Sequence, residues 1–180
     1  MAKPTPDFLE LLKILSKHEV DFIVVGGVCA VLHGAPVTTF DLDIVHSRSR
    51  KNITRLVSAL EELEAYYRER KDKQITPKQA HLASPGHHLL MTKSGPLDLL
   101  GTIGRGHTYN DLLPRTVELN VSDRQVRMLG LEVLIQVKKE TITEKDKIII
   151  PILQRTLEEK VKGKAKAGKK NHNSGDSGRQ

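Results

Sequence analysis

The stretches Phe22-Ile23-Val24-Val25-Gly26-Gly27 and Phe40-Asp41-Leu42-Asp43-Ile44 decide the fold of this 180-residue chain. The apolar run before the two glycines has the length and composition of a buried strand. Gly26 and Gly27 allow a tight turn without a side chain that could block a ligand. The segment 28–33 is short, apolar and free of helix-breaking residues, so it predicts a helix after the turn. A helix that begins beside such a turn offers unpaired N–H groups, which suit phosphate.

Two carboxylates follow on the second predicted strand. Residues 39–45 alternate, which predicts Asp41 and Asp43 on one face and the apolar residues, Phe40 included, on the other. Like charges on one face repel, and a shared divalent cation relieves the repulsion; Mg²⁺ prefers oxygen ligands. A phosphate site facing a carboxylate pair is what metal-assisted phosphoryl or nucleotidyl transfer needs. Either motif alone is more often structural, and their order and spacing together favour the functional interpretation.

A third carboxylate, Asp98, lies on a later predicted strand, residues 97–103. Leu97 and Leu99 face one side of that strand, and Asp98 faces the other. By itself an aspartate beside a Gly-Pro turn is most often structural. If the strand is the neighbour of the one that carries Asp41 and Asp43, all three carboxylates can hold metal, and the upstream motif favours this interpretation.

The remaining periodicities predict an α+β domain, a small mixed sheet that carries both motifs and is flanked by helices. Thr5 is the expected N-cap of a helix that ends near His18, and Ser49 or Asn52 opens a long helix to about Arg70. Residues 71–85 are polar and predict a loop or lid. Further strands are expected over residues 88–92, 116–120 and 125–129. Helices are expected over 131–140, where residues 133–137 also fit a strand, and from Thr143 onward, with a kink or break at Pro151.

These residues resemble a known family. Gly26-Gly27, Asp41-Leu42-Asp43 and Asp98 together resemble the signature of the DNA-polymerase-beta-like nucleotidyltransferase superfamily. A longer string is similar to the bacterial branch that contains the nucleotidyltransferase toxins of type IV toxin–antitoxin systems: His33-Gly34-Ala35-Pro36, Thr39, Leu134-Ile135, Lys138 and Lys145-Asp146. The resemblance covers about residues 8–159. Val37 departs from it, because related sequences often carry arginine there, which removes one basic contact to triphosphate or acceptor and leaves the metal site intact.

The resemblance implies that a nucleoside monophosphate moves from a triphosphate such as ATP to an acceptor hydroxyl, with release of pyrophosphate. Asp41 and Asp43 would bridge two Mg²⁺ ions, and Asp98 would bind the ion next to the attacking oxygen. The implied nucleotide-binding residues are Gly26, Gly27, Thr39, Lys138 and Lys145. The two lysines also fit a structural interpretation, since Lys138 lies where a cation complements a helix end.

By resemblance the acceptor is RNA, in particular a tRNA-like RNA. Two alternatives to this RNA-modifying activity stay open. One is nucleotide transfer to a small molecule or a protein. The other is a catalytically silent interaction module, and an antitoxin-like protein is an expected partner in the toxin-like branch. Arg48, Arg50 and Lys51 follow the catalytic strand and fit either a path for the acceptor or a solvated loop.

Composition predicts one cytoplasmic domain over residues 1–159, with its C-terminal helical part at about 131–159, and a disordered basic tail over 160–180. Cys29 is the only cysteine, the apolar runs are too short for a bilayer, and the N-terminus lacks the apolar core of a signal peptide. Of the net charge of +7, the tail carries +6, from seven Lys or Arg and one Asp. Such a tail fits either salt-dependent attraction to nucleic acid or a solubilising end.

Overall fold

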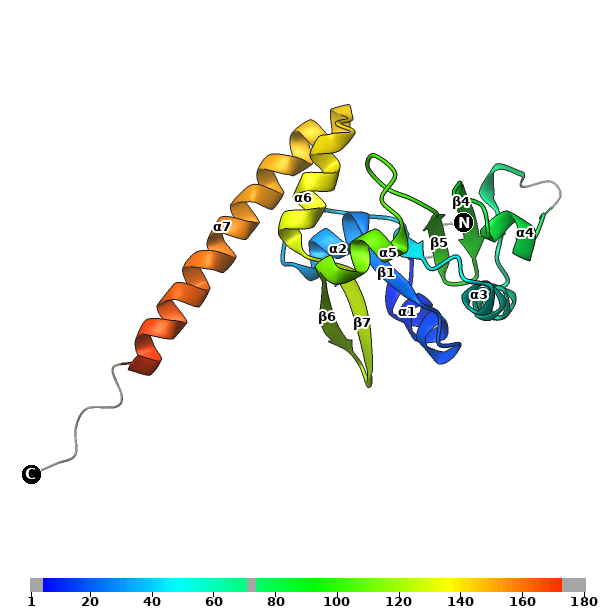
Figure 1. Ribbon diagram of the computed structural model, residues 1–180, viewed down its shortest axis with the longest axis horizontal. Coiled ribbons are helices and arrows are strands. Elements are labelled where there is room, and N and C mark those ends of the chain that lie inside the picture. Colours follow the sequence, from blue (N-terminus) through cyan, green and yellow to red (C-terminus); the bar gives the residue numbers. More distant parts are fainter. Residues whose placement is uncertain (1–4, 71–73, 173–180) are drawn as a thin grey trace, which may run out of the picture.

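The computed structural model describes residues 5–70 and 74–172, and within them it shows the expected α+β architecture around one seven-stranded mixed sheet (Figure 1). The strand order is β3-β4-β5-β2-β1-β7-β6. The strands are β1 (Phe22–Val25), β2 (Leu42–His46), β3 (Tyr66–Tyr67), β4 (His87–Thr92), β5 (Gly95–Leu100), β6 (Thr116–Val121) and β7 (Arg124–Leu129).

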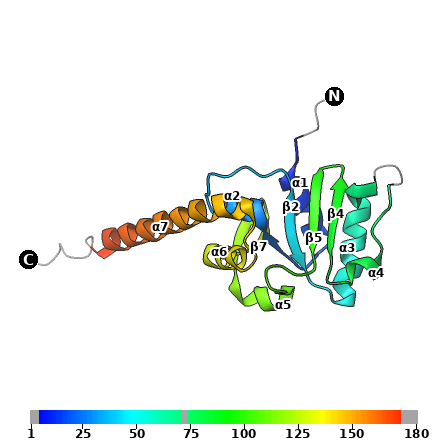
Figure 2. The ribbon, with the colours of Figure 1, turned by 90° about the horizontal axis from the view of Figure 1, so that it is seen from above.

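Helices α3 and α4 contact each other at one side of the sheet, and α6 and α7 contact each other at the other side, where α7 extends away from the sheet (Figure 2). The α-helices are α1 (Phe8–Lys17), α2 (Gly26–Leu32), α3 (Arg50–Glu62), α4 (Gln79–Leu82), α5 (Tyr109–Leu112), α6 (Leu131–Glu140) and α7 (Glu144–His172). Two 3-10 turns, η1 (Arg68–Arg70) and η2 (Leu113–Arg115), complete the chain. No helix among the described residues has the length and apolar character needed to cross a membrane.

The centre of the sheet is built from the two motif strands and the strand that carries the third carboxylate. β1 runs antiparallel to β2, and β2 runs parallel to β5. Leu42, Ile44, Leu97 and Leu99 are all 0% exposed and lie in the hydrophobic core. Each such side chain contributes about 1.5–3 kcal/mol by leaving water, so the core holds β2 and β5 side by side in a defined register.

Two predicted helix boundaries in the first half of the chain are wrong, and a predicted loop there contains a short helix. Asp7, not Thr5, is the N-cap of α1, because its Oδ1 accepts a hydrogen bond of 2.9 Å from the Glu10 N–H. Ser49 caps α3, but that helix ends at Glu62 instead of continuing to Arg70. The following residues pair with β4 as the short strand β3, so cross-strand pairing overrides the helical spacing of the apolar residues. The expected polar loop contains α4, and its residues 71–73 lie outside the described residues.

The expected disordered tail is also wrong over residues 160–172, which continue α7. A cap formed by Thr143 and Asp146 starts this helix, with hydrogen bonds of 3.0 Å and 3.2 Å in the two directions. Lysine and alanine are good helix formers, and extending an existing helix needs no new nucleus, so the segment stays helical without burying apolar surface. Pro151 lies inside α7 without ending it. Residues 173–180 lie outside the described residues.

Candidate metal and nucleotide site

The structure brings the three predicted carboxylates together at one edge of the central strands. Asp43 and Asp98 are direct partners in the parallel pairing of β2 with β5, and Asp41 lies one residue before β2. One ligand atom from each of the three lies within 4.8 Å of the other two. Asp41 and Asp43 are half-buried, so the cluster is open to solvent on one side. We refer to Asp41, Asp43 and Asp98 as the carboxylate cluster.

The carboxylate cluster carries more negative charge than its surroundings neutralise. Burial, followed by the charges of Asp41 and Asp98, raises the pKa of Asp43 to about 7, although a backbone hydrogen bond from Gly27 and the charge of Lys138 oppose this rise. Burial also raises the pKa of Asp98 to about 6, against the opposing charge of Arg68. Three carboxylates crowded together offer a set of oxygen donors that fits a hard divalent cation such as Mg²⁺, whose charge would relieve the repulsion between them.

The glycine turn packs directly on the carboxylate cluster. Gly26 has φ +65°, and a Cβ there would lie 2.2 Å from Oδ2 of Asp43. A Cβ at Gly27 would lie 2.5 Å from Oγ1 of Thr39. Glycine is therefore required at both positions by close approach, and at Gly26 by backbone conformation as well. The turn leaves backbone N–H groups, instead of side chains, beside the carboxylates.

Thr39 contacts the cluster through Asp41. Its hydroxyl lies 3.2 Å from the carbonyl oxygen of Asp41 and 3.3 Å from its Oδ1. Since Thr39 also lies directly against Gly27, it fills the space between the turn and the first carboxylate. The structure therefore places this predicted nucleotide-binding residue where it positions Asp41.

The two predicted lysines have different surroundings. Nζ of Lys138, on α6, lies 2.8 Å from Oδ1 of Asp146 on α7, and its charge opposes the rise in the pKa of Asp43. Lys138 thus lies near the cluster and is held there by a carboxylate outside it. Lys145 is exposed on α7, and over residues 5–70 and 74–172 its side chain has no hydrogen bond or ion pair. No hydrogen bond or ion pair among the described residues joins Lys145 to the cluster, so its role in nucleotide binding stays a prediction.

Two features of the site escape the sequence analysis. Arg68, which the sequence places inside a long helix, forms an ion pair with Asp98. No local pattern indicates it, because the contact depends on how β3, β4 and β5 pair. Phe40 was predicted on the apolar face of a strand, but β2 begins only at Leu42, and Phe40 is 71% exposed beside Asp41.

His33, from the family-like string, connects three elements near the end of α2. Its Nε2 lies 2.7 Å from the carbonyl oxygen of Leu129, which ends β7, and its Nδ1 lies 3.0 Å from Nζ of Lys160 on α7. Because Nε2 donates to the carbonyl, Nδ1 is left to accept from the lysine. His33 therefore fastens α7 to the domain and has no contact with the carboxylate cluster.

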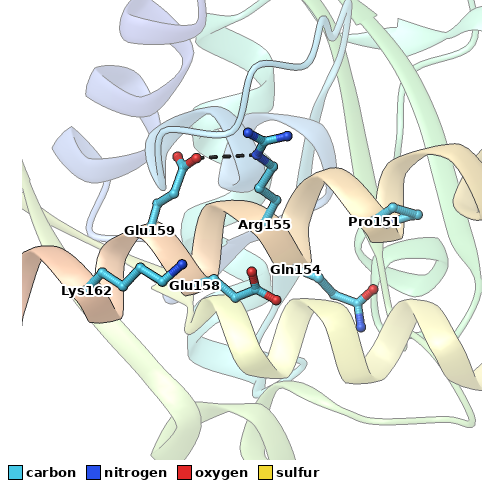
Figure 3. Close-up of a pocket in the computed structure, with 6 residues that line it drawn as sticks. All are labelled: Pro151, Gln154, Arg155, Glu158, Glu159 and Lys162. Atoms are coloured by element: carbon cyan, nitrogen blue, oxygen red, sulfur yellow. Dashed lines mark hydrogen bonds and ion pairs between the residues drawn. The ribbon is translucent and has the colours of Figure 1, made fainter.

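A hollow of about 520 Å³ lies elsewhere, on α7 (Figure 3). Arg155 and Glu159 form an ion pair of 3.4 Å there, and the hollow is lined entirely by one exposed face of the helix. The lining residues are Pro151, Gln154, Arg155, Glu158, Glu159 and Lys162. None of them belongs to the carboxylate cluster or the glycine turn, so this hollow is not part of the candidate site.

The fold is that of solved nucleotidyltransferase structures. The lincosamide antibiotic adenylyltransferase LnuA, in its lincomycin-bound form, is similar with a TM-score of 0.56 and 16% identity, over 82% of this chain and 94% of that one. The antibiotic-resistance factor ANT(2'')-Ia is similar with a TM-score of 0.53 and 14% identity, over 93% and 91%.

A candidate nucleotidyltransferase from Thermotoga maritima gives a TM-score of 0.51 and 16% identity, over 82% of this chain and 91% of that one. The sequence matches no protein-family model and no curated protein. The likeness therefore lies in the fold, which is the nucleotidyltransferase fold.

Proposed function

We propose that this protein is a Mg²⁺-dependent nucleotidyltransferase, which moves a nucleoside monophosphate from a triphosphate to an acceptor hydroxyl and releases pyrophosphate. The observation that carries the proposal is the convergence of three carboxylates, distant in sequence, beside a glycine turn that no larger side chain could occupy. The nucleotidyltransferase fold supports it independently.

The proposed roles follow from the positions of the residues. Asp41 and Asp43 would hold both metal ions, and Asp98 would hold the one nearest the attacking oxygen. Bound there, the ions would stabilise the attacking and leaving oxygens of an in-line displacement. Backbone N–H groups of Gly26 and Gly27 would bind the phosphates. Lys138 would supply positive charge near the triphosphate, and ATP is the triphosphate that we propose.

We propose RNA, tRNA-like by resemblance, as the acceptor. The support is α7, which projects from the domain (Figure 1) and carries lysines at 160, 162, 164 and 166 without an acidic residue between them. A cationic helix of this kind attracts phosphate backbones in a salt-dependent way and does not select a sequence. The resemblance to toxin-like proteins adds an antitoxin-like protein as a proposed partner.

A small hydroxyl compound is a second candidate acceptor. The structure of LnuA, which is an adenylyltransferase with bound lincomycin, favours it. The domain without its basic end carries a net charge of only +1, so nothing in its overall charge requires a polyanionic acceptor.

The test is a transfer assay with each of four labelled triphosphates and Mg²⁺, against total RNA, protein and small-molecule fractions. We expect label in RNA, and we expect Asp43→Asn to lower transfer by more than about a hundredfold, since loss of even an outer-sphere partner costs about 10–100-fold. Asp123→Asn, at an exposed turn between β6 and β7, makes the same chemical change outside the site and should leave transfer intact.

The outcomes separate the candidates. Label in the small-molecule fraction alone would replace RNA as the acceptor and leave the enzymatic proposal standing. Normal transfer by Asp43→Asn would rule out the mechanism. Metal binding without transfer to any fraction would instead favour a silent interaction module.

A further inference from the structure

Among the residues that the structure describes, Arg68 is the cation that forms an ion pair with the carboxylate cluster. It begins the 3-10 turn η1, and its Nη2 donates to Oδ1 of Asp98. The Asp98 side chain is 10% exposed and that of Arg68 is 25% exposed, so the pair lies at the margin of the site. Lys138, a second cation whose charge acts on the cluster, is held by Asp146. Arg68 thus has a position that neither the metal nor the phosphate assignment above explains.

A guanidinium on Asp98 opposes a metal ion on the same carboxylate. It occupies one carboxylate oxygen, and its positive charge repels a divalent ion bound within a few ångströms. A triphosphate changes this balance, because its negative charge attracts both the ion and the guanidinium. The planar fork of arginine also matches phosphate oxygens in two simultaneous hydrogen bonds.

We propose that Arg68 is a positioning residue that couples metal binding to triphosphate binding, an inference that rests on the proposed function. In the nucleotide-free protein Arg68 holds Asp98 and weakens metal binding. When a triphosphate enters, the guanidinium moves from Asp98 to the phosphates, and the carboxylate becomes a full metal ligand. By linkage, metal and triphosphate then strengthen each other's binding by the same factor.

The position of Arg68 permits this movement. Arg68 lies on a short turn after β3, outside the hydrogen-bonded strands, and its side chain is partly open to solvent. A rotamer change there breaks the ion pair without disturbing the pairing of β4 with β5. Asp98, in contrast, is fixed by its register opposite Asp43 and Leu89.

The test uses two ligands on the same variant. Binding of Mn²⁺ alone is measured by electron paramagnetic resonance, and binding of manganese tripolyphosphate by calorimetry, so neither readout needs transfer activity. We expect Arg68→Gln to tighten Mn²⁺ about tenfold, as loss of a competing charged hydrogen bond predicts, and to weaken manganese tripolyphosphate several-fold. A variant with a damaged fold would bind both ligands more weakly.

Two control variants sharpen the result. Arg55→Gln, on α3, removes an equal charge from an ion pair with Glu19, and should change neither affinity. Arg68→Lys keeps the charge, so its Mn²⁺ affinity should stay close to that of the unaltered protein, while its tripolyphosphate affinity falls because the fork is lost.

Each remaining outcome decides the inference. Unchanged or weaker Mn²⁺ binding by Arg68→Gln would overturn it, and the weaker binding would make Arg68 a permanent support of Asp98. If neither the unaltered protein nor Arg68→Gln binds Mn²⁺, the metal site and this inference both fall. If the binding results are as expected but no transfer is found, the proposed function falls and the coupling by Arg68 stands.

Discussion

Asp43→Asn is expected to stabilise the metal-free protein at alkaline pH, although it removes a proposed metal ligand. The folded chain holds Asp43 in a half-buried position between two other carboxylates, which raises its pKa from 3.8 to about 7. A carboxyl group whose pKa is raised by folding contributes stability that is fully present at low pH and is lost as pH rises through the folded value. The loss therefore falls between about pH 4 and pH 7.

The size of the effect follows from the two pKa values. A difference of one in pKa corresponds to about 1.4 kcal/mol, so ionised Asp43 costs at most ~4 kcal/mol above pH 7. Because Asp43 keeps some contact with solvent, we expect about half of this, ~2 kcal/mol. Asparagine keeps the size of the side chain and an acceptor for the Gly27 N–H, so the substitution removes mainly the charge.

The assay is thermal unfolding in a chelator at pH 4 and pH 8. For a domain of this size, ~2 kcal/mol corresponds to an increase in Tm of roughly 4–8 °C at pH 8, and the increase should shrink to under about 2 °C at pH 4. Saturating Mg²⁺ at pH 8 should make the Tm of the unaltered protein higher than that of Asp43→Asn, because the ion stabilises only the protein that binds it. Asp123→Asn is the control, and as a surface change it should stay within about 0.5 kcal/mol.

Three results would contradict this reasoning. Asp43→Asn could be less stable than the unaltered chain at pH 8. Its increase in Tm could be equal at pH 4 and pH 8. Saturating Mg²⁺ could leave Asp43→Asn with the higher Tm. The first two would mean that the carboxylate cluster is not under electrostatic strain. The third would mean that it does not bind the ion.

Two further predictions concern the turn and α7. Gly26→Ala should lower transfer by more than about tenfold, because the added Cβ meets the Asp43 carboxylate. Gly34 also has positive φ, but a Cβ there would have no neighbour within 4 Å. Gly34→Ala should therefore cost only ~1 kcal/mol of backbone strain and keep most of the transfer activity. Leu153→Ala, at a position 0% exposed on α7, should lower the free energy of unfolding by about 2–5 kcal/mol. Ile148→Ala, 69% exposed on the same helix, should change it by under about 0.5 kcal/mol in urea unfolding. Equal loss of transfer by the two glycine variants would refute the close contact assigned to Gly26. Equal loss of stability by the two α7 variants would refute the burial assigned to Leu153.

Much of the fold could be predicted because its signals are local. α6 begins and ends where its apolar spacing indicates, and the Thr143–Asp146 cap of α7 can be found in four residues of sequence. The turn at Gly26 and the alternation that points Asp43 and Asp98 to one face are equally local. Spacing along the chain therefore predicted which carboxylates could converge.

Other features depend on partners distant in sequence. α3 stops at Glu62 because the residues after it pair with β4, and this pairing places Arg68 beside Asp98. Neither follows from periodicity, since residues 53–67 keep helical spacing beyond the point where the helix ends.

The sequence by itself determined the chemistry available to this protein: a turn that only glycine can form, carboxylates on defined strand faces, and a lysine-rich end. Only the tertiary structure decided that the parallel pairing of β2 with β5 sets Asp43 beside Asp98, and that a guanidinium closes one side of the cluster. The physical reason is that side-chain direction is set by neighbours along the chain, whereas distance between strands is set by burial of the whole core.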